Sequence, residues 1–285
     1  MIDFALRNTE LFFRDKMSVL MSMLAEVIIM TLYIIFMRDN LRQQFILIEN
    51  AEIILDVWMI AGIVGITPVT AAMGTYSIMI QDKMSNIDRD FRVSPLGPVR
   101  ITCGYVMSAV MTGIVLSFII YIISEIYLMI NYGSAAGNGN VMKIYGVIIL
   151  DSVCSAAMVI LPVSFLKTSN SLAGCCTIFG ALIGFLTGIY LPIGSLGNGA
   201  AISVKCFPVS HAVILFRHLL TEPVISKTID MNSDEASEFM EYMGVKLIWQ
   251  GEIIQPHMSI MFLILCAAIC LVITVLKHII YEKHR

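Results

Sequence analysis

Residues 257–280 read HMSIMFLILCAAICLVITVLKHII, an apolar run with one lysine near its end. A helix of about 20 apolar residues crosses the hydrocarbon core of a bilayer, so this run has the length of a transmembrane helix. Five earlier runs have the same character: Met17–Met37, Val57–Ile80, Ile101–Ile130, Ile144–Leu166 and Ser171–Pro192. The pattern predicts an all-α integral membrane protein with about six transmembrane helices in a single domain, residues 1–285.

The composition supports a membrane-spanning chain. Of the 285 residues, 58% are hydrophobic and 14% are charged, whereas soluble domains carry about 25% charged residues. The net charge of −3 and the scattered basic residues argue against a nucleic-acid partner. The seven cysteines and five histidines form neither a disulfide framework nor the spacing of a metal site. We therefore expect no metal and no cofactor in this chain.

The distribution of basic residues predicts the orientation in the membrane. Eleven of the 18 Lys and Arg residues lie at the two termini or in the loops on the same side as the termini. Seven lie on the other side, and four of these are in the long segment before the last span, where basic residues count little. Basic residues favour the cytoplasmic side of short loops. The sequence thus predicts a multi-pass protein of the cell membrane with both termini cytoplasmic.

Two segments outside the spans have membrane-surface character. Residues 1–16 place charges at helical spacing opposite apolar side chains, which predicts an amphipathic elbow helix; a solvated lead-in to the first span is the alternative. Residues 193–256 form an outer segment containing FPVSHAVILFRHLL at 207–220, which is too short to span. This stretch is expected to be re-entrant or interfacial, in contact with membrane lipid. Ser233 to Met243 predicts an outward-facing helix.

The loop at 81–100 reads QDKMSNIDRDFRVSPLGPVR and predicts a short charged helix that ends before Pro95. A stiff, charged knob with the aromatic ring of Phe91 at its tip suits docking on a cytoplasmic partner. An ordinary basic cytoplasmic loop explains the segment equally well. The residues expected to dock are Asp88, Arg89, Asp90, Phe91 and Arg92.

The order of these segments resembles the membrane (permease) subunits of type-2 ABC exporters. The similarity is carried by RNTELFFRDKMSVLMSMLAEVIIMTLYIIFM, by DRDFRVSPLGPVRITCGYVMSAV and by FPVSHAVILFRHLL. The resemblance implies a permease dimer, either a homodimer or a heterodimer, bound to cytoplasmic ATP-binding subunits that hold ATP and Mg. It also implies that Ile87 to Val93 is the coupling helix, although Asn86-Ile87-Asp88 stands where the family commonly has a glutamate-glycine pair. The substrate pathway would be lined mainly by the first, second and fifth spans.

The sequence contains no G-x-x-x-x-G-K-[ST] motif, so the chain is expected not to be an enzyme and to depend on a partner for ATP hydrolysis. These features predict the permease subunit of an ATP-driven exporter that moves a hydrophobic or amphipathic compound outward. The alternative is an ion- or proton-coupled secondary transporter or channel that uses the acidic residues within the spans, Glu26, Glu125 and Asp151.

Several residues within the spans are candidates for function. Glu26 is the strongest, because the resemblance places the first span along the pathway, whereas structural polar contacts are expected for Glu125 and Asp151. Small residues at a spacing of four predict close helix packing on the fifth span, within the chain or across a dimer. Thr67-Pro68 predicts a kink that is either a gating joint or a static bend. The predicted pathway residues are Glu26, Met30, Thr67 and Pro68, and the predicted packing residues are Gly180, Gly184 and Gly188.

Overall fold

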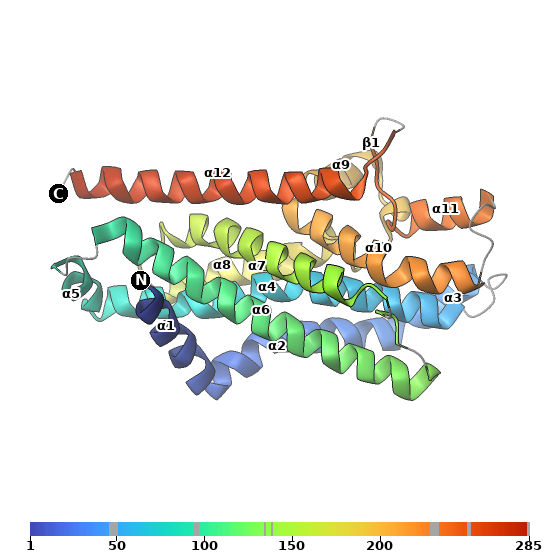
Figure 1. Ribbon diagram of the computed structural model, residues 1–285, viewed down its shortest axis with the longest axis horizontal. Helices are drawn as coiled ribbons and strands as arrows, with labels where there is room; N and C mark the ends of the chain where they lie inside the picture. The colour runs from blue at the N-terminus through green and yellow to red at the C-terminus, as the bar shows by residue number, and fades with distance from the viewer. Residues whose placement is uncertain are drawn as a thin grey trace.

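The computed structural model describes residues 1–45, 51–93, 97–133, 135–137, 139–228, 234–249 and 252–283. The described chain folds into an elongated helical bundle whose long helices run side by side (Figure 1). Among these residues, six helices are long and apolar enough to cross a membrane. This confirms the predicted all-α fold. The spanning elements are α2 (Lys16–Leu32) with its continuation through η1 (Tyr33–Met37) and α3 (Arg38–Gln44), α4 (Ala51–Met84), α6 (Gly97–Tyr132), α7 (Val141–Val163), α8 (Ser169–Leu186) and α12 (Pro256–Lys283).

Helix α4 forms the centre of the bundle. Its most apolar window is 89% buried, whereas the corresponding windows of α2, α8 and α12 are 22% or less buried. A helix that is apolar all round is typical of such a central position. Pro68 lies inside α4, and the helix continues past it to Met84, while the Thr67 hydroxyl donates to the carbonyl of Ile63 at 2.8 Å.

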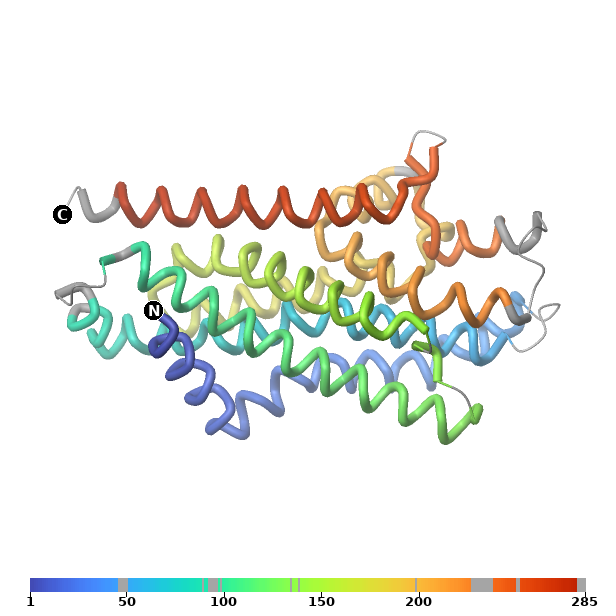
Figure 2. Tube along the Cα trace, in the orientation of Figure 1, coloured from blue at the N-terminus to red at the C-terminus, as the bar shows by residue number. Residues whose placement is uncertain are grey.

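The N-terminal helix α1 (Ile2–Arg14) lies obliquely across the bundle, as Figure 2 shows. Phe4, Ala5 and Phe12 are buried on one side of it, so the predicted amphipathic helix is present. The chain then turns at Asp15, whose carboxylate accepts hydrogen bonds from the Ser18 hydroxyl and from the backbone N–H groups of Ser18 and Met17. These bonds hold the pKa of Asp15 below its usual value, and the bond from the Ser18 side chain has the largest effect.

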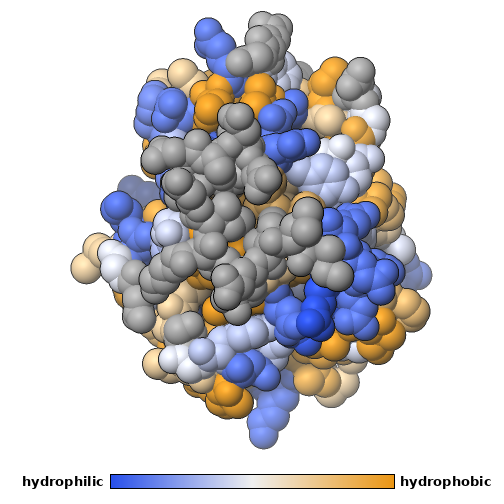
Figure 3. All heavy atoms as spheres, turned by 90° about the vertical axis from the view of Figure 1, so that its right-hand side faces the viewer, coloured by the Kyte–Doolittle hydropathy of each residue, from blue (hydrophilic) through white to orange (hydrophobic). Residues whose placement is uncertain are grey.

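The two ends of the bundle differ. The short helix α5 (Ile87–Val93) and the C-terminal end of α12 lie at one end, with the N-terminus towards it (Figure 1). The opposite end, which the sequence predicts to face outward and which we call the outer end, carries α3, α11 (Asp234–Tyr242) and a hairpin of β1 (Ile248–Trp249) and β2 (Glu252–Ile253). The two strands pair antiparallel, with Ile248 opposite Ile253. Hydrophilic and hydrophobic side chains alternate over this end in Figure 3. The predicted helix start at Ser233 lies outside the described residues.

Between α8 and α12, the chain forms a bent helix pair. After the short turn η2 (Ile193–Ser195), α9 (Asn198–Cys206) and α10 (Pro208–Thr228) meet at 84°. The inward side of α10 is fully buried in the bundle, including Val209, Ala212 and Phe216. This geometry is that of a broken span or a re-entrant loop, in keeping with the predicted membrane-dipping segment.

The fifth span is shorter than predicted. Helix α8 ends at Leu186, and Gly188 lies in the following turn with a φ of +66°, a backbone conformation that favours glycine. The backbone N–H groups of Ile189 and Tyr190 both donate to the carbonyl of Gly184. The ring of Tyr190 covers Gly184, while Gly180 faces open space. Within the protomer, Gly184 is therefore covered by Tyr190 and Gly188 lies beyond the helix, while packing at the open face of Gly180 across a dimer stays a prediction.

Candidate functional site

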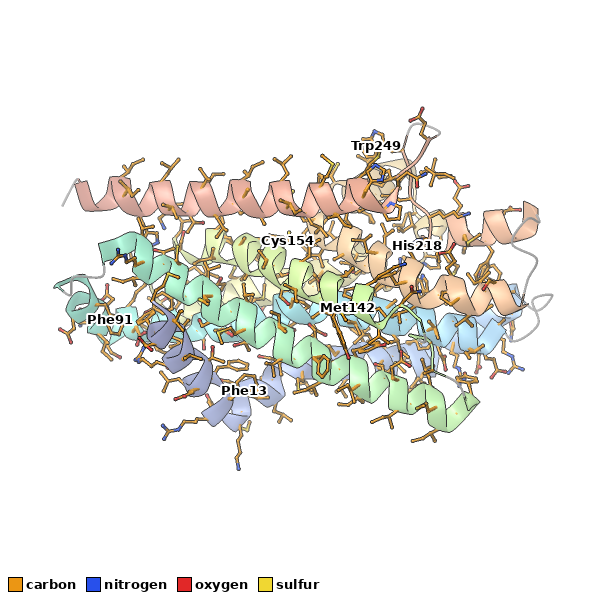
Figure 4. All side chains as sticks on the ribbon, in the orientation of Figure 1. Phe13, Phe91, Met142, Cys154, His218 and Trp249 are labelled. Atoms are coloured by element: carbon orange, nitrogen blue, oxygen red, sulfur yellow. The ribbon has the colours of Figure 1, made fainter. Side chains whose placement is uncertain are left out.

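Aromatic rings join the short helix α5 to α1 and α6. The ring of Phe4 makes edge-to-face contacts with Phe91 on α5 and with Tyr105 on α6, each with ring centres 5.0 Å apart. The guanidinium of Arg7 lies 5.3 Å from the ring centre of Phe91. Figure 4 shows Phe91 at the end of the bundle where α5 meets α4. The aromatic residue that the sequence placed at the tip of an exposed knob is thus partly covered by the chain itself.

A buried carboxylate fastens this group of rings to α4. Asp82 is 4% exposed, and its Oδ2 accepts a hydrogen bond from the Tyr105 hydroxyl at 2.7 Å. Arg7 forms an ion pair with the same oxygen at 3.4 Å. We call Phe4, Arg7, Asp82, Phe91 and Tyr105 the elbow cluster. It connects α1, α4, α5 and α6, so a displacement of α5 has a direct path to two spanning helices.

A second polar network lies at the outer end of the bundle, around Asp56. This residue is fully buried near the start of α4. Its carboxylate accepts hydrogen bonds from the hydroxyls of Tyr33 at 2.9 Å, Tyr127 at 3.0 Å and Tyr132 at 2.8 Å. Arg38 forms an ion pair with it at 3.2 Å. We call these five residues the Asp56 network, and it links the outer part of the first span, η1 and α3, to α4 and α6.

The π-helical turn η1 lets two residues of the first span reach Asp56. Tyr33 and Arg38 are five positions apart, which places them about 140° apart around an α-helix. In η1 the backbone N–H of Arg38 donates to the carbonyl of Tyr33, the five-residue bond of a π-helix. This wider turn brings both side chains to the side that faces α4. Such turns are frequent at functional sites in helices.

The predicted pathway residues lie inside the protomer. Glu26 is 2% exposed, and its Oε1 accepts a hydrogen bond from the Thr70 hydroxyl of α4 at 2.7 Å. Thr67 and Pro68 are buried in α4, and Met30 packs against the core. In the single protomer these four residues therefore do not form an open surface. The exposed face of α2 consists of other apolar residues, including Met21, Leu24, Val27 and Ile28.

The other two acidic residues within spans have structural contacts. The carboxylate of Glu125 accepts hydrogen bonds from the backbone N–H groups of Ala136 at 3.0 Å and Gly137 at 2.9 Å, and it thereby holds the loop after α6. Asp151 is fully buried in α7, and its Oδ1 accepts a hydrogen bond from Ser155 at 3.1 Å. Within the part of the chain that the structure describes, no group of His, Cys, Asp or Glu could hold a metal ion.

Sequence reasoning missed Asp56, Asp82 and their tyrosine partners. Both acids lie near the ends of α4, where the sequence suggests a residue in contact with water at the edge of the membrane. A usable signal was present in the tyrosines, because Tyr105 and Tyr127 interrupt otherwise aliphatic spans. A buried tyrosine hydroxyl needs a hydrogen-bond partner. The identity of that partner depends on which helices become neighbours, and that was not visible in the chain order.

An amphipathic elbow, six spans, a short helix held against the elbow and a bent pair before the last span define a multi-pass membrane permease. A family model described as ABC-2 type transporter matches residues 4–221, which is more than half of the chain. The chain belongs to this family. It is therefore the transmembrane component of an ABC transporter, and the family implies a partnership with an ATP-binding subunit. No curated protein and no solved structure matches the chain.

Proposed function

We propose that this permease exports a hydrophobic or amphipathic compound outward across the cell membrane, driven by ATP that a cytoplasmic partner hydrolyses. The observation that carries the proposal is the elbow cluster, which joins α5 to α1, α4 and α6 through packed rings and an ion pair between the partly exposed Arg7 and the buried Asp82. A force applied to α5 by the partner would move these helices together. ATP and Mg²⁺ would bind to the partner, because this chain lacks the usual phosphate-binding loop.

The docking surface of α5 would be the side that faces away from the elbow cluster. Phe91 turns inward to Phe4, whereas Ile87 is 37% exposed and Asp90 is exposed. In this arrangement Phe91 acts as a positioning residue that transmits movement, and residues on the opposite side of α5 meet the ATP-binding subunit. This differs from the docking role that its sequence context predicted for Phe91.

The exposed faces of α2 and α8 support an apolar cargo pathway between two permease copies. Both helices pack against α4 on one side and leave most of their surface uncovered. The exposed residues of α8 are mostly small, whereas those of α12 are bulky aliphatic side chains. Small residues permit close helix packing in membranes, and bulky aliphatic residues suit lipid. We place α8 at the dimer interface and α12 in lipid.

A cross-linking experiment tests this dimer arrangement. In a cysteine-free chain, a single cysteine in place of Thr177 on α8 should form a disulfide-linked dimer upon oxidation in membranes. A cysteine in place of Ile264, which is exposed on α12, should remain monomeric. The measurement is the shift on a non-reducing gel. Cross-linking at Ile264 without cross-linking at Thr177 would show that the dimer interface lies on α12 and not on α8.

The orientation is tested by accessibility to a membrane-impermeant thiol reagent. Exposed positions at the two ends of the bundle are available at Ser85, beside α5, and at Lys143 and Glu252 at the outer end. Single cysteines at Lys143 and Glu252 should react in intact cells, and one at Ser85 should react only after the cells are opened. Labelling of Ser85 in intact cells would reverse the orientation and remove α5 from the reach of a cytoplasmic partner.

A further inference from the structure

A buried arginine lies beneath two turns at the outer end of the bundle. Arg217, on α10, is fully buried. Its Nη2 donates to the carbonyl of Gly188 at 2.8 Å, and its guanidinium lies 4.3 Å from the ring centre of Trp58 on α4. Among the residues that the structure describes, its Nε and Nη1 have no hydrogen-bond partner, and no carboxylate forms an ion pair with it.

Burial of Arg217 costs more free energy than burial of the acidic residues. A carboxyl group such as that of Asp151 can take up a proton and become neutral, whereas an arginine keeps its charge at physiological pH. Arg38 shows the usual solution, because the carboxylate of Asp56 lies 3.2 Å from its Nε. An uncompensated buried charge is costly, and interaction with the Trp58 ring offsets only part of that cost. An anion that reached Arg217 would therefore gain an unusually strong partner.

Two tight turns cover Arg217 at the outer end. Gly188 and Gly244 both have a φ of +66°, and the side chain of Ile193 packs against both turns. The indole Nε1 of Trp58 donates to the carbonyl of Met243 at 2.6 Å, which fastens the second turn to α4. The cover is thus tied down by this bond and by the bond from Arg217 to Gly188. Both turns lie just beyond the ends of helices α8 and α11, so their separation from Arg217 would leave the spanning helices intact.

We propose that Arg217 binds the anionic headgroup, a carboxylate or a phosphate monoester, of an amphipathic cargo when these turns open. The proposal rests on the proposed export function and names its class of cargo. A guanidinium offers paired N–H donors to the oxygens of either group, and its charge strengthens these bonds. The ring of Trp58 lies against the guanidinium, and the neighbouring residues Phe216 and Ile189 are fully buried in the apolar core, which suits the adjoining hydrocarbon of the cargo.

The fluorescence of Trp58 provides a direct binding test. The chain has two tryptophans, so Trp249→Phe leaves Trp58 as the sole reporter, beside Arg217. The purified full-length protein in neutral detergent is titrated with lysophosphatidate, with lysophosphatidylcholine of the same acyl chain, and with inorganic phosphate. Lysophosphatidate should change the emission, and the other two should not. Arg217→Gln should raise the half-saturating concentration of lysophosphatidate by about tenfold or more, the loss expected for a charged hydrogen bond.

Arg42→Gln is the matched control, because Arg42 is an exposed outer arginine outside the site and should leave the titration unchanged. Equal responses to both lysolipids, or a response to inorganic phosphate alone, would overturn the proposal even if Arg217→Gln fails to fold.

In nanodiscs, saturation by phosphatidylglycerol that lysophosphatidate does not displace would indicate a resident lipid and would also overturn it. Binding is measured without the ATP-binding subunit. ATP-driven transport with no binding contradicts this inference alone, and binding without ATP-driven transport contradicts the export function alone.

Discussion

Asp56→Ala is expected to lower the free energy of unfolding by about 3 kcal/mol or more, because a hydrogen bond to a charged group contributes about 1.5–3 kcal/mol and three such bonds are lost. The carboxylate is fully buried and accepts hydrogen bonds from Tyr33, Tyr127 and Tyr132 while it pairs with Arg38. Without it, a guanidinium and three hydroxyls lose their shared acceptor between the outer part of the first span, α4 and α6. The measurement is the midpoint temperature of thermal unfolding in detergent, which should fall sharply.

Glu52→Ala is the matched control for this prediction. Glu52 also pairs with Arg38, at 3.6 Å, and with Arg42, at 2.8 Å, but its side chain is 37% exposed. Ion pairs in contact with water contribute about 0–1 kcal/mol, so the midpoint should change little. Similar small shifts for both variants would show that the Asp56 network does not hold the outer end of the first span.

Phe4→Ala and Phe91→Ala are each expected to uncouple ATP hydrolysis from transport while the ATP-binding subunit remains bound. The two rings form one edge-to-face contact between α1 and α5, and truncation of either ring removes it. A packed aromatic pair contributes about 0.5–1.5 kcal/mol beyond its buried area, which corresponds to a reduction of about two- to tenfold in the cargo transported per ATP hydrolysed. Since both residues act through the same contact, the double variant should be no worse than the more affected single variant.

Phe13→Ala controls for a general loss of packing in α1. Phe13 lies on the same helix and makes an edge-to-face contact with Phe12 at 5.4 Å, away from α5 in Figure 4. It should leave coupling intact. Uncoupling of equal size in this variant would show that α1 acts as a membrane anchor whose stability matters, and not as the partner of α5. Release of the ATP-binding subunit by Phe91→Ala alone would restore the docking role that the sequence predicted.

The spans were predictable from the sequence because the bilayer sets their length and excludes charges. The elbow helix and the membrane-dipping segment at residues 207–220 followed for the same reason, since one is amphipathic and the other is apolar but too short to cross. The boundary of α8 was not predictable from hydropathy, because the turn at Gly188 is as apolar as the helix. The residue type alone does not show whether a glycine continues a helix or ends it. The backbone conformation at Gly188 shows that it ends the helix.

The contacts of the site were largely beyond the sequence. Phe91 lies in a charged segment, so its local context indicated an exposed ring, and its partner Phe4 is far away in the chain. Similarly, Asp56 and Tyr132 meet only because α4 and α6 pack side by side. Periodicity within one helix gives a face, but it does not say which other helix covers that face. The roles of Glu26, Met30, Thr67 and Pro68 in cargo passage remain predictions.

Transport in reconstituted vesicles tests most directly whether an ATP-binding partner drives this permease through α5. The permease is reconstituted with the ATP-binding subunit that co-purifies with it, with the α5 end facing outward, and a fluorescent hydrophobic dye is added with ATP and Mg²⁺. Dye should accumulate in the vesicles, and accumulation should persist after a protonophore removes the proton gradient. The Phe4→Ala variant should continue to hydrolyse ATP with little dye uptake. Uptake that proceeds without ATP and stops with the protonophore would contradict the proposed mechanism and favour a gradient-driven transporter.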